Sequence, residues 1–177
     1  MKFEVKQRIH GSVDEVEQAL LHPQYLDFVL QHHGVLQEAQ ALEIKDEGER
    51  VRRRIRYRPR PVIKHVGPKE IPPEWFAFIE ESTWDKARKE LTFRNVPTSN
   101  AIRNMLVNTG TLRLRGVNGA TELSMAGEIN IKVPFILKPL ALIAEKIIQH
   151  EGLKILDANV PVLNRFVGEV LRVRRAE

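Results

Sequence analysis

Residues 127–156, GEINIKVPFILKPLALIAEKIIQHEGLKIL, contain the point at which the spacing of hydrophobic residues changes. Up to Lys132 they alternate with polar residues, which is the pattern of a strand with one buried face. After Pro134 they recur at three- and four-residue intervals, which predicts an amphipathic helix. The helical spacing includes Leu137, Leu140, Ala141, Ala144, Ile147, Ile148, Ile155, Val162, Phe166, Val167, Val170 and Leu171. We therefore expect a last strand followed by one long helix or two collinear pieces, with Gly152 and Pro161 as the places for a bend.

Upstream of this point, nearly a hundred residues keep the period of two that is typical of strands. The predicted strands are 35–45, 49–58, 75–84, 88–95, 105–116 and 120–132. Short turn sequences separate several of them, DEGE, DKAR and VNGA, the last with the Asn-Gly pair of a tight hairpin. Such short connections predict an antiparallel meander. The five prolines of residues 59–74 predict an extended loop without regular structure.

The N-terminal residues predict one more strand and two short helices. Residues 2–10 alternate between apolar and polar positions, as in a half-buried strand. Ser12, with Glu15 three residues later, has the pattern of a helix capping box. Pro23 then starts a second short helix, which we expect to end near Gly34.

Composition limits the function classes. A chain of 177 residues with 42% hydrophobic content is expected to form a single domain, residues 1–177. The absence of cysteine excludes disulfides, thiolate metal sites and cysteine nucleophiles. The first 16 residues lack the apolar segment of a signal peptide. The apolar run 133–148 is interrupted by Lys138, Pro139 and Glu145 and is short for a bilayer span. We expect a soluble, cytoplasmic protein.

The order of these elements resembles the START-like (helix-grip) superfamily, which includes SRPBCC and polyketide cyclase-like proteins. Residues 5–29, VKQRIHGSVDEVEQALLHPQYLDFV, look like its opening strand, "s-x-e-x-v" helix and "p-x-y" segment. Residues 127–156 are similar to the last strand and grip helix of an uncharacterised bacterial branch. The resemblance covers nearly the whole chain. It implies an α+β helix-grip fold, in which a curved seven-stranded antiparallel sheet surrounds a long C-terminal helix and two short helices lie between strands 1 and 2.

The resemblance also implies a function, because relatives bind lipids, sterols, polyketides, quinones or hormones. One helix laid across a curved sheet can leave an apolar interior for such a ligand. We expect binding or transport of a hydrophobic or amphipathic, lipid-like molecule, without a cofactor or metal. The expected ligand-binding residues are Leu36, Leu42, Arg53, Ile55, Tyr57, Phe93, Leu112, Leu114, Met125, Ile129, Ile143 and Ile147. For each apolar residue among them the alternative is an ordinary place in the core.

Polar residues at predicted apolar positions are a second signal, because an unpaired buried polar group is costly. They are Gln7, Arg53, Glu80, Asn108 and Glu145. Two roles are open for Arg53. It forms an internal ion pair with Glu80, or it holds the carboxylate or phosphate of an amphiphilic ligand.

Residues 50–60, RVRRRIRYRPR, place seven arginines in eleven positions of a chain whose formal net charge is +5. In a strand, one face would carry Arg50, Arg52, Arg54, Arg56 and Arg58. Three interpretations are open. The arginines pair with carboxylates on adjacent strands, with Glu43 and Glu81 as candidates; they contact an anionic membrane; or they bind nucleic acid or a ribosome. Nucleic acid is the weaker alternative, because no aromatic-basic RNA motif accompanies the run.

Catalysis is the rival function class. The histidines are scattered, and the adjacent His32 and His33 point to different faces of any regular element, so we expect no metal site. No Gly-rich phosphate loop, nucleophile elbow or His-Glu zinc motif is present. Some START-like relatives are cyclases or hydrolases, which implies Glu145 or Glu80 with Tyr57 as proton-transfer residues. We expect binding without chemical conversion.

Overall fold

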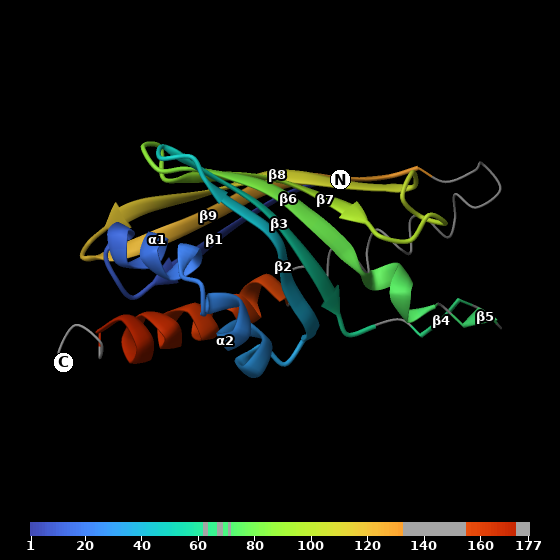
Figure 1. The fold of residues 1–177 in the computed structure, drawn as a ribbon, viewed down its shortest axis with the longest axis horizontal. Coiled ribbons are helices and arrows are strands. Elements are labelled where there is room, and N and C mark those ends of the chain that lie inside the picture. The colour runs from blue at the N-terminus through green and yellow to red at the C-terminus, as the bar shows by residue number, and fades with distance from the viewer. Residues whose placement is uncertain (62–63, 67–68, 71, 133–154, 173–177) are drawn as a thin grey trace.

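The computed structural model describes residues 1–61, 64–66, 69–70, 72–132 and 155–172. Within these residues the main feature is a seven-stranded antiparallel sheet in the order β1-β9-β8-β7-β6-β3-β2 (Figure 1). Its strands are β1 (Lys2–Ile9), β2 (Leu36–Asp46), β3 (Arg50–Pro59), β6 (Phe78–Asp85), β7 (Glu90–Pro97), β8 (Leu106–Val117) and β9 (Ala120–Ile131). The predicted meander is therefore confirmed, and β1 completes the sheet by pairing with β9.

The tight turn between β8 and β9 follows from its sequence. Asn118 and Gly119 both have positive φ angles, 47° and 73°. A two-residue hairpin turn whose twist matches that of its strands needs positive φ at both positions, and Asn-Gly is the pair that adopts it most readily. The Asn-Gly pair thus sets the register in which β8 and β9 align along their whole length.

Among the described residues, three helical segments lie on one side of the sheet: α1 (Val13–Leu21), α2 (Tyr25–His32) and residues 155–166, which continue into the π-helical η3 (Val167–Arg172). The predicted capping box is present. The Glu15 N–H donates to Ser12 Oγ over 3.3 Å, and the Ser12 N–H donates to Glu15 Oε2 over 2.8 Å. The predicted helical positions 137–148 lie outside the described residues. None of the described helices is long and apolar enough to cross a membrane.

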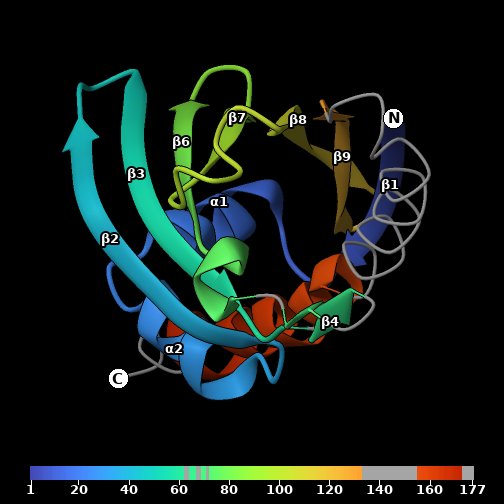
Figure 2. The ribbon, with the colours of Figure 1, turned by 90° about the vertical axis from the view of Figure 1, so that its right-hand side faces the viewer.

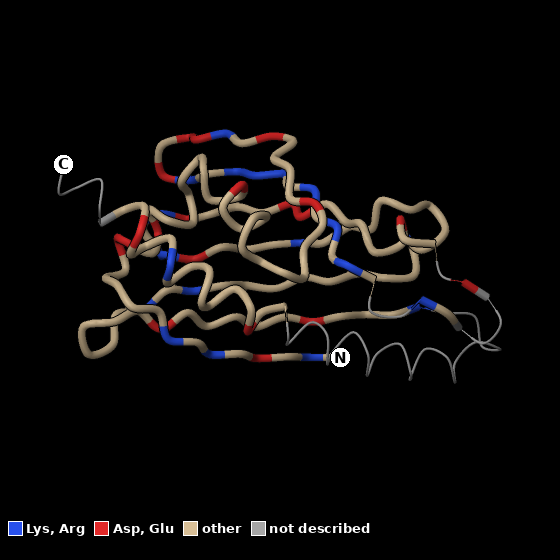
Figure 3. Tube along the Cα trace, turned by 90° about the horizontal axis from the view of Figure 1, so that it is seen from below, with Lys and Arg blue, Asp and Glu red and all other residues tan. Residues whose placement is uncertain are grey.

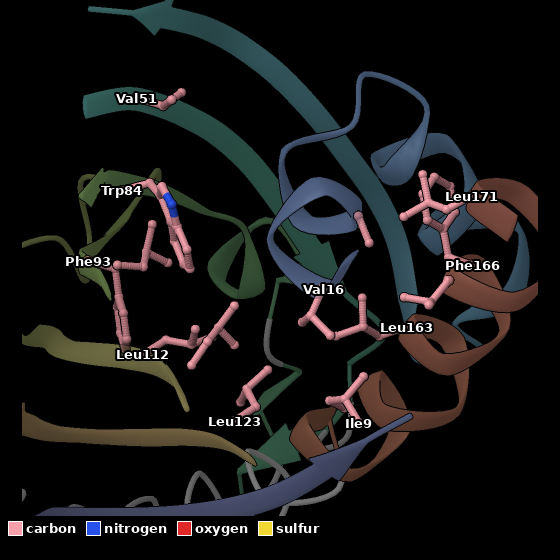
Figure 4. Close-up of a cluster of buried hydrophobic side chains, with 14 residues drawn as sticks. Ile9, Val16, Val51, Trp84, Phe93, Leu112, Leu123, Leu163, Phe166 and Leu171 are labelled. Carbon is pink, nitrogen blue, oxygen red and sulfur yellow. The ribbon is translucent and has the colours of Figure 1, made fainter. Parts of the chain in front are cut away.

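The sheet is strongly curved. Figure 2 shows it as an arch from β2 to β1, with helical residues 155–172 lying across its open side. Side chains of α1, of this helical segment and of the strands beneath them form a buried apolar cluster (Figure 4). Ile9, Val16 and Phe166 are fully buried in it. We call the face of the sheet that looks toward this cluster the inner face.

Two details differ from the prediction. Residues 59–74 were expected to lack regular structure, but they contain the small hairpin of β4 (His65–Val66) and β5 (Lys69–Glu70). The 3-10 turn η1 (Pro73–Phe76) spans the end of this range and the start of the predicted strand 75–84, so β6 begins only at Phe78. Proline is favourable at the first position of a helical turn, where its missing N–H would have no partner, so Pro73 starts η1 instead of preventing it.

Leu42 is the second difference. It was expected on the inner face, but it is 45% exposed. The register of β2 against β3 shifts between Ala41 and Glu43, so Leu42 is the extra residue of a β-bulge. A bulge changes the alternation of side chains at that point. Leu42 therefore lies exposed at a bulge, not buried in the apolar interior as expected.

Candidate functional site on the inner face of the sheet

The inner face divides into two halves along the strands. The half nearer α1, which we call the packed half, carries Val51, Trp84, Leu91, Leu112, Leu114 and Leu123, all buried in the apolar cluster. Trp84 also donates its indole N–H to Glu17 Oε1 of α1 over 2.7 Å. This half is the hydrophobic core.

Two aromatic rings mark the end of the packed half, and glycines beneath them make room. A Cβ on Gly110 would lie 2.7 Å from the ring of Phe93 and 2.5 Å from the carbonyl oxygen of Ala126. A Cβ on Gly127 would lie 2.7 Å from the ring of Phe3. Because both distances are shorter than van der Waals contact, each ring rests directly on the backbone of a glycine.

Beyond these rings, one row across the sheet is polar. Glu80 on β6, Asn95 on β7 and Asn108 on β8 are successive cross-strand neighbours. Ile55 on β3 and Ile129 on β9 stand at the two ends of the row. We call Glu80, Asn95 and Asn108 the polar row, and the part of the inner face that contains it the polar half.

An ion pair neutralises the charge at one end of the polar row. Arg53 Nη2 lies 3.5 Å from Glu80 Oε1, and the two side chains are 13% and 17% exposed. Arg53 also donates to the carbonyl oxygen of Leu20 over 3.1 Å, and Ser82 donates to Glu80 Oε1 over 2.9 Å. The predicted internal ion pair is confirmed. Its contacts tie β3 and β6 to the end of α1.

The charges of this ion pair influence the pKa values of two tyrosine hydroxyls, Tyr57 and Tyr25. Burial raises the pKa of the Tyr57 hydroxyl, and the Glu80 carboxylate raises it further, while Arg53 lowers it. Burial also raises the pKa of Tyr25, with Arg53 opposing it. Both phenols therefore stay protonated over the physiological pH range. They can act as neutral hydrogen-bonding groups but not as bases.

The two asparagines of the polar row are incompletely satisfied. Asn95 Oδ1 and Asn108 Oδ1 are buried, and neither accepts a hydrogen bond within the described part of the chain. A buried acceptor without a donor costs on the order of 1–3 kcal/mol, and most such atoms in folded proteins have a partner. Two such acceptors therefore lie side by side on neighbouring strands of the inner face.

The structure places most of the predicted ligand-binding residues on the inner face. They are Arg53, Ile55, Tyr57, Phe93, Leu112, Leu114, Met125 and Ile129. Leu36 is partly buried opposite Pro59. Of these, Phe93, Leu112 and Leu114 belong to the apolar cluster. Ile143, Glu145 and Ile147 lie outside the described residues.

Asn95 is the residue that the sequence reasoning missed. Strand β7 reads ELTFRNVP, in which Leu91, Phe93 and Asn95 alternate on the inner face. The signal was the same as for Asn108, a polar residue in the apolar register of a strand. The importance of Asn95 becomes visible only when β7 is placed beside β8, since Asn95 and Asn108 are cross-strand neighbours.

The arginine row of β3 lies on the opposite, outer face, as predicted. Figure 3 shows acidic positions beside its run of basic residues. Each arginine has a carboxylate within reach: Arg50 with Asp85 (3.6 Å), Arg52 with Glu47, Arg54 with Glu81 (3.6 Å), and Arg56 and Arg58 with Glu38 (3.0 and 3.6 Å). Glu81 is a predicted partner, whereas Glu43 instead contacts Lys45 at 2.7 Å. The charges of this strand are thus largely balanced within the sheet.

Among the described residues, no group of three or more histidine or acidic side chains could hold a metal ion. His33 is the buried histidine, and its Nε2 lies 3.2 Å from the carbonyl oxygen of Ile155. It borders a surface groove of about 260 Å³ beside residues 158–165. This contact joins the end of α2 to the C-terminal helical segment, which is a structural role.

Solved structures share this architecture. TTHA0849 from Thermus thermophilus is 14% identical with a TM-score of 0.65, over 92% of this chain and 97% of that chain. The Zhui aromatase/cyclase from Streptomyces sp. R1128 is 13% identical with a TM-score of 0.67, over 96% of both chains. Norcoclaurine synthase from Thalictrum flavum, in complex with dopamine and hydroxybenzaldehyde, is 14% identical with a TM-score of 0.59, over 96% of this chain and 87% of that chain.

These likenesses show a shared fold, the START-like helix-grip fold that the sequence resemblance implied. Among curated proteins nothing matches the sequence. Residues 4–150 match the family described as "Protein of unknown function (DUF2505)". The chain belongs to this family.

Proposed function

We propose that this protein binds a hydrophobic or amphipathic small molecule against the polar half of the inner face. The observation that supports the proposal best is the pair of buried, unpaired oxygens of Asn95 and Asn108. They lie in a row that ends in Ile55 and Ile129, on the concave side of a curved sheet. Ligand sites are typically concave and mostly apolar, with a few polar groups that fix the orientation of the ligand.

The surrounding contacts favour binding without chemical conversion. A general base needs a free lone pair directed at the substrate. Glu80, the described candidate, already accepts from Ser82 and faces the Arg53 guanidinium. Tyr57, its proposed companion, keeps its proton because burial raises its pKa. Tyr57 therefore does not act as a base, and the Glu80 carboxylate is engaged through Oε1 as the counter-ion of Arg53.

The ion pairs of the outer face weigh against a second function in membrane or nucleic-acid binding. An anionic surface attracts arginines whose charge is not already met by a neighbouring carboxylate. The five arginines of the row share four carboxylates, with Glu38 contacting both Arg56 and Arg58, so most of their charge is met and the proposal does not include an anionic partner.

Titration with the neutral apolar dye N-phenyl-1-naphthylamine tests the proposed function. The full chain should bind it saturably, with a fluorescence increase and a one-to-one stoichiometry. Asn108→Trp, which places a large ring in the polar half, should reduce the affinity at least tenfold. Asn130→Trp is the matched control, because Asn130 is one residue beyond Ile129 on β9 and exposed.

Thermal unfolding of each variant shows whether it folds, and Asn108→Phe replaces Asn108→Trp if the larger ring prevents folding. Two results would contradict a site on the inner face. One is no dye binding to the wild type, and the other is equal dye affinity in the folded Asn108 variant and in Asn130→Trp. Native mass spectrometry of the freshly purified chain adds an independent readout, since a copurifying apolar molecule is expected.

A further inference from the structure

We infer that the molecule bound at the polar half is uncharged and presents a hydroxyl group to Asn95 and Asn108. This inference rests on the proposed function and specifies the ligand class. Two features of the polar half support it: the balance of its charges and the hydrogen-bonding capacity left open in its row.

The charge balance disfavours an anionic ligand. On the inner side of β3, β6, β7, β8 and β9, the charged side chains among the described residues are Arg53 and Glu80, which pair with each other. A ligand carboxylate would bring a second negative charge to one guanidinium. It would have to displace Glu80 or remain uncompensated in a partly buried place, and both are costly.

The same pair disfavours a cationic ligand. An ammonium group would compete with Arg53 for the Glu80 carboxylate and leave the guanidinium without its counter-charge. A partly buried guanidinium without its counter-charge is costly. Arg53 is also held in place by the Leu20 carbonyl oxygen, so it does not easily turn away to solvent.

The hydrogen-bonding capacity selects among neutral groups. Asn95 Oδ1 and Asn108 Oδ1 need donors, whereas the buried Arg53 Nε needs an acceptor. A ketone, ether or ester oxygen only accepts, so it can meet Arg53 Nε but leaves both asparagine oxygens unpaired. A hydroxyl donates one hydrogen bond and accepts two. It therefore also suits either amide if that amide turns to present its nitrogen.

Apolar side chains border the row and suit the rest of such a molecule. Ile55 and Ile129 stand at its ends, and Phe93 lies one row toward the core. On the other side, the rings of Tyr57 and Phe78 lie 5.6 Å apart. A flat or extended hydrocarbon body with one hydroxyl group matches this arrangement.

Isosteric probes test the inference by displacing bound N-phenyl-1-naphthylamine at pH 7. The set is 2-naphthol, 2-naphthoate and 2-methylnaphthalene, with 1-nonanol and nonanoate as a second body shape. In at least one of the two series, naphthalene or nonyl, the hydroxyl compound should bind at least tenfold more tightly than the corresponding carboxylate. In the double variant Asn95→Leu and Asn108→Leu, the preference for 2-naphthol over 2-methylnaphthalene should fall about fivefold, as expected for the loss of one hydrogen bond. Asn130→Leu should retain the wild-type preference.

A single substitution tests the charge balance by itself. Glu80→Gln removes the carboxylate that occupies Arg53, so the ratio of the affinity for 2-naphthoate to the affinity for 2-naphthol should rise at least fivefold.

The outcomes separate the two proposals. If the dye binds but carboxylates compete as well as alcohols in both shapes, or no probe displaces it, the hydroxyl inference is wrong and the binding function stands. The inference is also wrong if the Asn95 and Asn108 double variant keeps its preference for 2-naphthol, or if Glu80→Gln does not raise the ratio of the affinity for 2-naphthoate to the affinity for 2-naphthol. If the dye itself does not bind to the wild type, both proposals fail.

Discussion

The same strands form the packed half and the polar half of the inner face, but the packed half is apolar and the polar half carries Glu80, Asn95 and Asn108. On β7, Leu91 is buried in the apolar cluster, whereas Asn95, four residues later, has a buried oxygen without a donor. On β8, Leu112 and Asn108 show the same contrast in the opposite chain direction. The alternation of side chains that places leucines in the core therefore also places Asn95 and Asn108 in the candidate site. The two halves differ only in which residue types point inward.

The largest expected effect lies in the apolar cluster to which the packed half belongs. Phe166 is fully buried and its ring contacts those of His22, Tyr25 and Phe28 at centroid distances of 5.1–5.3 Å. Phe166→Ala should lower the free energy of unfolding by about 3–5 kcal/mol, because it removes the ring and leaves a cavity. Urea denaturation followed by circular dichroism measures the loss. A loss below about 1 kcal/mol would mean that this cluster is not the core.

A smaller but still large loss of stability is expected when the ion pair of Arg53 and Glu80, which contacts the end of α1, is broken. Glu80→Gln leaves the Arg53 charge partly buried without a carboxylate and should cost about 2–3 kcal/mol. The double variant Arg53→Met and Glu80→Leu should recover most of this loss, since it removes both charges together. An equal loss in the single and double variants would show that the ion pair does not couple the two residues.

Gly110 lies at the boundary between the two halves, and Gly110→Ala should lower the free energy of unfolding by about 1–3 kcal/mol. The added Cβ would meet the Phe93 ring and the Ala126 carbonyl oxygen at distances that require a shift of both. Gly34→Ala is the matched control, because nothing lies within 4 Å of its Cβ position. Thermal unfolding of both variants provides the comparison, and equal melting temperatures would contradict the close packing described here.

The smallest expected effect has the opposite sign and lies in the polar half. Asn108→Leu replaces a buried oxygen without a donor by an apolar group, which should raise the free energy of unfolding of the ligand-free chain by about 1 kcal/mol. Asn130→Leu should change it by less than about 0.5 kcal/mol. Denaturant unfolding after ligand removal is the measurement. A destabilised Asn108→Leu would indicate that the Asn108 oxygen is satisfied in solution.

The sequence was sufficient for most of the architecture because the hydrophobic period is strong in this chain. The strands, the two short helices and the capping box of Ser12 all follow from local patterns. The ion pair of Arg53 and Glu80 was also predictable, since two opposite charges in apolar registers need each other.

What remained hidden depends on the register between strands. The bulge at Leu42 has no local signature, because nothing in the β2 sequence states where one extra residue is inserted. The partners of the arginine row were predicted in part. Glu81 was found, while Glu38, Glu47 and Asp85 were missed. Asp85 lies directly opposite Arg50 and Glu38 directly opposite Arg58, so finding them required the register of β3 against β6 and β2.

The bulge in β2 has a consequence for how the molecule behaves at high concentration. β2 is the last strand of the sheet order, and its Leu42 and Ile44 are 45% and 52% exposed. A straight, apolar border strand would invite a strand of another molecule to extend the sheet, which is a route to aggregation. The irregular backbone around Leu42 and the charged pair of Glu43 and Lys45 interrupt such a straight strand, which disfavours extension of the sheet along this stretch of β2.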